Sequence, residues 1–264
     1  MNTARSSHGD ALVGHTGFVG SNLAAQHPFA GLFNSANVAK IEGREFDTVV
    51  FSAARAEKWR INQDPQTDRV HIESLKNTLR SFRANQLVLI STVDVYASPV
   101  GVDESTPVPA PGLHAYGLHR AELERFAADH FESVLVVRLP ALFGAGIKKN
   151  VIFDLLHDNN TDKIDHRGTF QYYNLGRLWA DIETARAAGL RLVNFATEPV
   201  STGVVAREAF GFEFDNEPPG SVAGSYDFRS LYADEFGGQN GYLYSADEVL
   251  AELRSFVSSQ RATV

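Results

Sequence analysis

The sequence feature that most constrains the fold is a glycine-rich turn near the N-terminus. The stretch at residues 11–24, ALVGHTGFVGSNLA, opens with apolar residues and carries Gly14, Gly17 and Gly20. This pattern predicts a short strand, a tight turn and the first turn of a helix. Glycines let a backbone approach a pyrophosphate closely, and the free N–H groups of a helix start attract negative charge. We therefore expect a nucleotide site, although a purely structural turn can have the same spacing.

Composition narrows the classes of function. The chain has 264 residues, of which 44% are hydrophobic, and a net charge of −8 at pH 7. An acidic balance argues against general nucleic-acid binding, which needs a basic surface. Cysteine is absent and no HExxH pattern or His/Asp cluster occurs, so we expect no metal site.

No apolar run reaches the roughly 18 residues of a membrane span. The N-terminal MNTARSSHGD also lacks the apolar core of a signal peptide. We therefore expect a cytoplasmic protein without a membrane partner.

Apolar runs and helical periodicities alternate over the first half of the chain. Strands are predicted over residues 31–33, 48–51, 87–90 and 134–137, and helices over 18–26, about 72–82 and from 116. Because the strands are apolar on both faces, a parallel sheet covered by helices is expected. Only about a dozen residues separate the second strand from the third, too few for another helix and strand. We therefore expect a doubly wound sheet with one strand–helix unit trimmed.

The pattern is less regular after Gly146. Helices are predicted over residues 151–157, 181–188 and 201–210, and a strand over 190–195. The last helix opens with the capping box Ser245-x-x-Glu248. We predict a dinucleotide-binding domain over residues 1–145 and a small, mostly helical substrate-binding cap over 146–264, interleaved with the first.

Three polar side chains are placed for acid–base chemistry. Tyr116 and Arg120 lie one turn apart on one face of a predicted helix. Thr92 ends an apolar strand and could meet them at the edge of the sheet. A cation beside a phenol favours the phenolate, so we expect Arg120 to lower the pKa of Tyr116. The alternatives for Tyr116 and Arg120 are a surface pair on an amphipathic helix or a decayed site.

Four motifs resemble, in order and spacing, those of the extended short-chain dehydrogenase/reductases. They are the glycine turn, Ser91–Tyr96 (STVDVY), the Tyr116 and Arg120 pair and Arg138–Gly144 (RLPALFG). Within that family the chain is similar to the NAD-dependent epimerases and dehydratases, which act mostly on nucleotide sugars. The resemblance covers residues 10–150 and is thin afterwards. It implies a Rossmann fold and NAD(P)-dependent redox chemistry at a secondary alcohol or ketone.

The resemblance also implies roles for matching positions. Tyr116 would be the general acid and base, Thr92 would polarise the substrate oxygen, and Arg120 would take the place of a catalytic lysine. The positions expected at the cofactor are Gly14, His15, Thr16, Gly17, Phe18, Val19, Gly20, Asn34, Ser35, Ala53, Ala54, Pro140 and Leu142.

Four further positions are candidates for the substrate, and each has an ordinary alternative. Asp94 could instead be a loop residue, and Asn150 could be a helix cap. Lys148 and Arg177 could contact a phosphate or could be solvated surface cations.

Three departures from the family pattern affect the expected reaction. Arg120 replaces a lysine, and a planar guanidinium is not an equivalent partner for the cofactor ribose. Ala141 replaces an asparagine, which removes a substrate contact. Val93 replaces the first acid of the pair found in sugar dehydratases, so we expect reduction or epimerisation rather than dehydration.

The cofactor and the partners follow from the same comparison. Asn34 and Ser35 are neutral where an acid would bind the 2′-hydroxyl of NAD, so we expect NAD(P) with a slight preference for NADP, helped by Arg44 or Arg55. The substrate is expected to be a small sugar derivative or a sugar nucleotide, and the resemblance implies a homodimer. The alternative function is a non-catalytic NAD(P)-binding protein with a regulatory or redox-sensing role.

Overall fold

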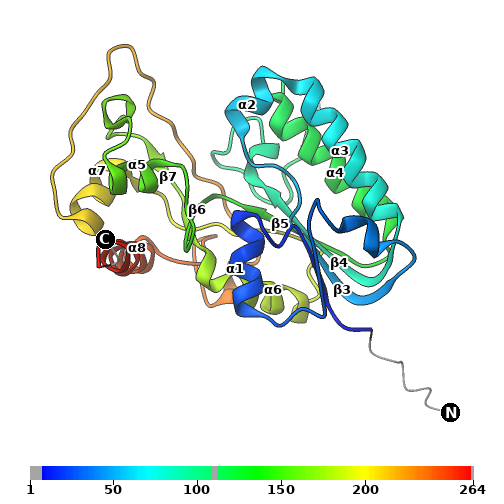
Figure 1. The fold of residues 1–264 in the computed structure, drawn as a ribbon. Coiled ribbons are helices and arrows are strands. Elements are labelled where there is room, and N and C mark those ends of the chain that lie inside the picture. The colour runs from blue at the N-terminus through cyan, green and yellow to red at the C-terminus, as the bar shows by residue number, and fades with distance from the viewer. Residues whose placement is uncertain (1–7, 109–111, 263–264) are drawn as a thin grey trace. The chain divides into compact units, whose positions relative to one another are not determined.

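A computed structural model of the chain describes residues 8–108 and 112–262 (Figure 1). Residues 1–7, on which part of the signal-peptide expectation rests, lie outside this range. The chain divides into two compact units, each made of three segments. Unit 1 comprises residues 1–97, 107–138 and 185–193, and unit 2 comprises residues 98–106, 139–184 and 194–264. No helix in the described ranges is both long and apolar enough to cross a membrane.

Unit 1 is built on a six-stranded sheet with the strand order β2-β1-β3-β4-β5-β9. Its strands are β1 (Ala11–Val13), β2 (Gly31–Phe33), β3 (Glu45–Phe51), β4 (Arg83–Thr92), β5 (Val134–Leu139) and β9 (Leu192–Asn194). The pairs β1–β2, β1–β3 and β3–β4 are parallel. Because a single short 3₁₀ turn (Val38–Ile41) joins β2 to β3, one strand–helix unit is indeed missing. The predicted doubly wound α/β fold is confirmed.

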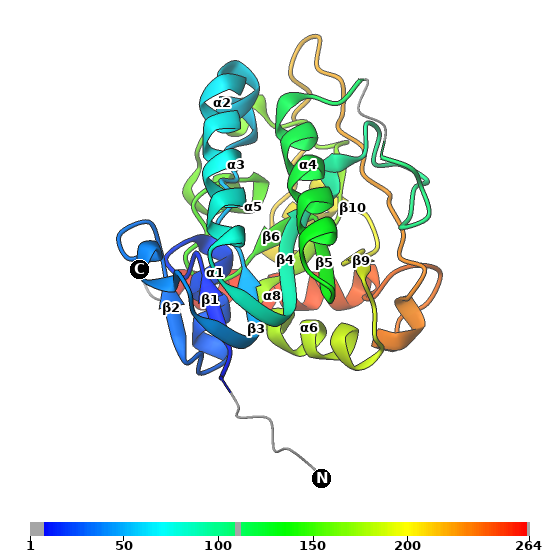
Figure 2. The ribbon, with the colours of Figure 1, turned by 90° about the vertical axis from the view of Figure 1, so that its right-hand side faces the viewer.

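Helices cover the sheet of unit 1. They are α1 (Phe18–Gln26), α2 (Lys58–Gln63), α3 (Pro65–Arg80) and α4 (Ala115–His130). Helices α3 and α4 lie side by side on one face of the sheet, and α1 covers the other (Figures 1 and 2). The apolar side chains of α3 and α4 pack on alternate residues of the strands, so the core includes Ile72, Leu75, Leu79, Leu123, Val13, Phe51 and Leu89.

Unit 2 combines short helices with two-stranded pairings. Its helices are α5 (Val151–His157), α7 (Thr202–Val205) and α8 (Ala246–Arg261), and most of α6 (Leu178–Ala187) also belongs to it. Strand β6 (Ala141–Phe143) pairs in parallel with β8 (Tyr172–Asn174), and β7 (Thr169–Phe170) pairs antiparallel with β10 (Val200–Ser201). The predicted capping box of the last helix is present, with Ser245 and Glu248 bonding each other's backbone.

Several predicted elements differ from the structure in extent. The helix predicted over residues 201–210 is α7 followed by a π-helical turn over Ala206–Phe210. The helix predicted over 181–188 starts earlier, at Leu178, and the strand predicted over 190–195 shortens to β9. Helix α2 was not predicted, because its sequence KWRINQ carries little apolar periodicity.

Candidate active site

The glycine turn is a close-packed junction at the end of β1. Gly14 has φ = +96°, and a Cβ there would lie 2.7 Å from the Ser52 carbonyl oxygen. A Cβ on Gly20 would lie 2.1 Å from the Gly14 carbonyl oxygen. The Gly14 N–H donates to the Phe33 carbonyl at 2.8 Å. Only glycine therefore lets α1 pack on the turn and the turn pack on the end of β3.

The start of α1 offers backbone donors. Its N-cap is Gly17, which provides no side-chain cap, and the first turn contains no acidic residue. Thr16 and Gly17 are exposed, whereas His15, Phe18 and Val19 are half-buried. The first-turn N–H groups and the helix dipole thus face an accessible turn without a side-chain acceptor. This arrangement fits a phosphate group.

The ends of β2 and β3 flank this turn, since β1 pairs with both strands. Asn34 uses its side-chain oxygen to accept from the Ala36 N–H at 2.9 Å, and Ser35 is exposed. Ala53 and Ala54 are half-buried and pack against the core.

Arg44 is one of the two arginines suggested near a 2′-phosphate. It precedes β3 and stacks on the rings of Phe33 and Phe46, 5.4 and 4.9 Å from their centroids. Phe33 is the last residue of β2 and directly precedes Asn34.

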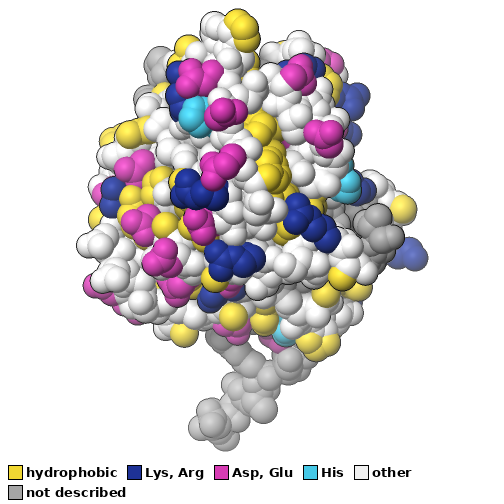
Figure 3. Space-filling model, turned by 90° about the vertical axis from the view of Figure 1, so that its left-hand side faces the viewer, with side chains coloured by type: hydrophobic (Ala, Val, Ile, Leu, Met, Phe, Trp, Pro, Cys, Tyr) yellow, Lys and Arg dark blue, Asp and Glu magenta, His cyan; other side chains and the backbone are white. Residues whose placement is uncertain are grey.

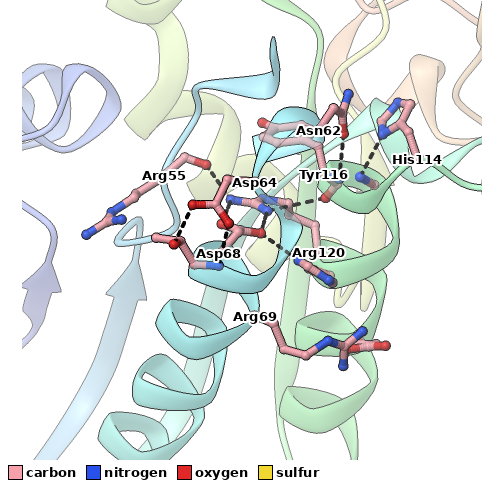
Figure 4. A network of polar contacts seen from close by, with 12 residues as sticks. Arg55, Asn62, Asp64, Asp68, Arg69, His114, Tyr116 and Arg120 are labelled. Carbon is pink, nitrogen blue, oxygen red and sulfur yellow. Dashed lines mark hydrogen bonds and ion pairs between the residues drawn. The ribbon is translucent and has the colours of Figure 1, made fainter. Parts of the chain in front are cut away.

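Tyr116 and Thr92 are brought together as predicted. Thr92 is the last residue of β4, and its side chain lies near enough to the Tyr116 phenol to act on the pKa of that phenol. A Cβ on Gly117 would lie 2.1 Å from the Asp94 carbonyl oxygen, so a glycine is needed for α4 to approach the turn after β4. The Tyr116 N–H donates to the Asn62 side-chain oxygen at 3.1 Å (Figure 4). The backbone of Tyr116 is thus held by α2, and its ring lies beside Thr92.

The pKa of Tyr116 is raised, contrary to the expectation that Arg120 lowers it. Burial is the main cause, and the charge of Asp94 adds to it. Arg120, the Thr92 side chain and Lys58 act in the opposite direction but do not outweigh burial. Tyr116 is therefore a protonated phenol at neutral pH in the ligand-free protein.

Arg120 belongs to a buried network, in which its two terminal nitrogens are bonded and its Nε has no partner (Figure 4). Its guanidinium bonds both carboxylate oxygens of Asp68, at 2.5 and 3.1 Å, and the Arg55 carbonyl oxygen at 2.6 Å. It also stacks 4.2 Å from the centre of the Tyr116 ring. Burial raises the pKa of Asp68, but hydrogen bonds from Arg120 and His119 hold it below its ordinary value. Arg120 is only 2% exposed.

Asp94 forms an ion pair that was not predicted. The Lys58 ammonium lies 2.8 Å from the Asp94 carboxylate, and Lys58 is half-buried. Lys58 is in α2, where no sequence pattern pointed to a site, so only the packing reveals this cation near Tyr116.

A second buried network also escaped prediction. Arg138, 4% exposed, bonds both oxygens of Glu124, at 3.1 and 2.6 Å, and the Tyr96 hydroxyl at 2.8 Å. The Ser91 hydroxyl donates to Glu124 at 2.5 Å. The network ties β4, α4 and β5 together beside Thr92, and it gives the motif residue Arg138 a structural role.

The remaining candidate residues lie in unit 2. Asn150 accepts from the Ile152 N–H at 3.0 Å and donates to the Leu142 carbonyl at 2.8 Å, so it caps α5. Arg177 pairs with Glu252 and stacks 4.1 Å from the Tyr244 ring centre. Lys148 is exposed, and Pro140 and Leu142 are half-buried.

The described residues contain no group of three or more metal-ligating side chains placed around a common point. On the face shown in Figure 3, acidic and basic side chains are interspersed rather than segregated by sign.

Comparison with known proteins gives a structural match alone. No protein-family model matches the chain, and no curated protein matches its sequence. Among solved structures, TunA, an NAD-dependent NDP-hexosamine 5,6-dehydratase, is 17% identical with a TM-score of 0.70, over 95% of this chain and 97% of TunA.

Two further structures show the same fold. MoeE5 in complex with UDP-glucose and NAD is 19% identical with a TM-score of 0.67, over 97% of this chain and 99% of MoeE5. The dTDP-4-dehydrorhamnose reductase of Bacillus anthracis, in complex with NADP, is 14% identical with a TM-score of 0.71, over 95% of this chain and 97% of the reductase. The chain therefore has, over nearly its whole length, the fold of the extended short-chain dehydrogenase/reductases.

Proposed function

We propose that the protein is an NAD(P)-dependent oxidoreductase or epimerase that acts on a secondary alcohol or ketone of a sugar or a sugar-nucleotide-like substrate. The observation that carries this proposal is that the Tyr116 phenol lies beside the Thr92 side chain at the carboxyl end of β4, with the Arg120 guanidinium 4.2 Å from its ring centre. The glycine turn lies in the same unit, at the same edge of the parallel sheet. In open parallel sheets ligands bind at this edge.

A nicotinamide dinucleotide fits the residues at the turn. Gly14 and Gly20 leave no room for a side chain, and the exposed, uncapped start of α1 suits a diphosphate. When bound, the nicotinamide supplies the hydride acceptor or donor. MoeE5 binds NAD and the reductase binds NADP. We infer a slight preference for NADP from the neutral Asn34 and Ser35 at the end of β2.

Tyr116 would move the proton. With its pKa raised by burial, the phenol is protonated at neutral pH and can donate its proton to a carbonyl oxygen as that oxygen becomes an alcohol. The Thr92 hydroxyl would orient the same oxygen. Arg120 places a positive charge against the ring, which stabilises the phenolate once the proton has left.

Substrate binding is proposed for the predicted cap, residues 146–264. Asp94, in unit 1, is a separate candidate for substrate binding. Lys148 is exposed and suits a phosphate, whereas Asn150 and Arg177 already bond partners within unit 2. Val93 stands where dehydratases carry an acid, and this favours reduction or epimerisation. The neighbouring structures include enzymes of nucleotide sugars, and MoeE5 binds UDP-glucose.

The test is turnover by wild type and Tyr116→Phe. Each is supplied with NADH or NADPH and a panel of UDP- and dTDP-linked 4-keto sugars, and dinucleotide absorbance is followed at 340 nm. Loss of a positioned acid should lower kcat by about 10²–10⁴-fold while the dinucleotide Kd changes less than about twofold.

Equal turnover by both proteins would contradict the role of Tyr116. Tight dinucleotide binding by wild type without turnover of any sugar, alcohol or ketone would favour the non-catalytic alternative.

A further inference from the structure

We propose that Arg55 binds the diphosphate of the dinucleotide, and that the buried pair of Arg120 and Asp68 holds the Arg55 backbone in the position required for this. The inference rests on the proposed function, because it concerns the same cofactor. It assigns Arg120 a different task from that of the lysine it replaces. Arg55 is the binding residue, and Arg120 is a positioning residue that acts through it.

Arg120 joins three separate parts of unit 1. From α4 it reaches Asp68 on α3 with two hydrogen bonds and the Arg55 carbonyl, after β3, with a third at 2.6 Å. A planar guanidinium can form all three at once because its donors point in fixed, divergent directions. A lysine ammonium has one nitrogen on a shorter stem and cannot span the same acceptors. An arginine at position 120 therefore suits a rigid link, here called the Arg120 strut, between α4, α3 and the loop after β3.

The Asp68 side of this strut is also fixed. His119 lies 2.7 Å from the Asp68 carboxylate, and both side chains are 2% exposed. Helix α3 starts at Pro65, and the Asp64 side chain accepts from the Thr67 N–H at its first turn. The carboxylate is consequently a rigid anchor for Arg120, and Arg120 in turn fixes the Arg55 carbonyl.

The loop that carries Arg55 adjoins the glycine turn. Val13 pairs with Phe51, and the Ser52 carbonyl lies against Gly14. Arg55 follows three residues later. Its side chain points away from Arg120, and Figure 4 shows its guanidinium on the opposite side from its bonded carbonyl. The side chain is exposed, and in the described part of the chain it forms no ion pair.

The charge of Arg55 is felt by His71, a residue that contacts the same loop at Ala53. His71, whose ring nitrogen lies 3.4 Å from the Ala53 carbonyl oxygen, has its pKa lowered by burial and, next, by the charge of Arg55. In a chain with a net charge of −8, an anionic ligand needs a local cation. Lys58, another cation of this region, is already paired with Asp94.

The strand order distinguishes the diphosphate from a 2′-phosphate. β1 lies between β2 and β3, so the end of β2 and the loop after β3 are on opposite sides of the glycine turn. The ribose 2′ position of a dinucleotide is recognised after the second strand, whereas the diphosphate lies over the turn itself. Arg55 therefore suits the phosphate chemistry that NAD and NADP share.

The first test compares Arg55→Gln with Arg60→Gln by isothermal titration with NADH and NADPH. Arg60 is a matched control, since it is an exposed arginine on α2 whose ion pair with Glu57 is 3.8 Å long. We expect Arg55→Gln to weaken both dinucleotides about tenfold or more, and by more at low salt, and Arg60→Gln to change Kd less than twofold.

Equal affinity of the two variants would overturn the proposal. Selective loss of NADPH would assign Arg55 to the 2′-phosphate and overturn it as well. If wild type binds neither dinucleotide, the proposed function itself fails and Arg55 loses its ligand. If wild type binds both and Arg55→Gln binds equally well, only the present inference fails.

The second test is a double-mutant cycle on the same affinities with Arg120→Lys. If Arg120 acts by positioning Arg55, Arg120→Lys should weaken binding several-fold in the wild-type background and have little effect in the Arg55→Gln background. A merely structural role would weaken binding equally in both. Unchanged or improved binding by Arg120→Lys alone would show that a lysine serves as well, and would overturn the strut.

Discussion

At the residue scale, the candidate site depends on which charges are buried together. The spacing of Tyr116 and Arg120 correctly placed them on one helix face, and the structure puts the guanidinium 4.2 Å from the ring centre. The spacing could not reveal Asp68, the partner of Arg120, because the two residues are 52 positions apart in the chain. Burial of the phenol, together with the charge of Asp94, explains why the pKa of Tyr116 is raised although Arg120 acts to lower it.

The buried pair of Glu124 and Arg138 gives a stability prediction. Glu124→Gln removes the charge that compensates a guanidinium with 4% exposure, so we expect the free energy of unfolding to fall by roughly 3 to 5 kcal/mol. Glu122→Gln is the control on the same helix. Its partner Arg69 is exposed and 3.5 Å away, and the loss should be under about 1 kcal/mol. Urea unfolding measures both, and similar losses would argue against the network.

At the element scale, periodicity succeeded where a helix or strand has one clear apolar pattern. The bounds of α1, β2 and α5 match the predicted ranges. β4 is longer than predicted because its first residues, Arg83–Gln86 (RANQ), carry no apolar run and pair with β3 nonetheless. Tertiary pairing, which local propensity does not encode, extends such strands. The π-helical turn after α7 likewise has no signature in the apolar pattern.

The packing of α1 on the glycine turn predicts the effect of Gly20→Ala. The added methyl group would lie 2.1 Å from the Gly14 carbonyl oxygen, so α1 must move away from the turn. We expect dinucleotide binding to weaken at least about tenfold and the free energy of unfolding to fall by about 1–3 kcal/mol. Ser21→Ala, at the next and exposed position, is the control and should change neither. Unchanged dinucleotide binding by Gly20→Ala would contradict a role of the glycine turn in binding the dinucleotide.

At the scale of the whole molecule, alternation of strands and helices predicted five strands of the sheet and its missing unit, because short connections restrict how parallel strands can be joined. The sixth strand, β9, was predicted as a strand of the cap. The irregular second half was less predictable. Its short strands, such as β6 and β8, pair only with each other and lack long apolar runs. The division at residue 145 and a homodimer remain predictions.

Buried tyrosines predict how stability depends on pH. Tyr172 and Tyr173 are almost fully buried, and burial raises the pKa of each phenol above its ordinary value of 10. In the unfolded chain these phenols ionise near pH 10, whereas in the folded protein they stay neutral. Stability should therefore be fully present below pH 10 and fall above it, by about 1.4 kcal/mol per pH unit for each such group.

Urea unfolding at pH 8, 10 and 11 checks this prediction. Tyr172→Phe keeps the ring but removes the ionisable hydroxyl, so its loss of stability above pH 10 should be less steep than that of wild type. Parallel losses in the two proteins would contradict the assignment to Tyr172.

The central claim is that the glycine turn binds a nicotinamide dinucleotide, and that Tyr116 transfers the proton in the redox reaction of that dinucleotide. Its most direct test is calorimetric titration of the purified wild-type protein with NADH and with NADPH. The account predicts saturable binding of at least one dinucleotide with one site per chain, together with a rise in Tm that grows with ligand concentration. Absence of binding and of any rise in Tm with both dinucleotides would contradict it.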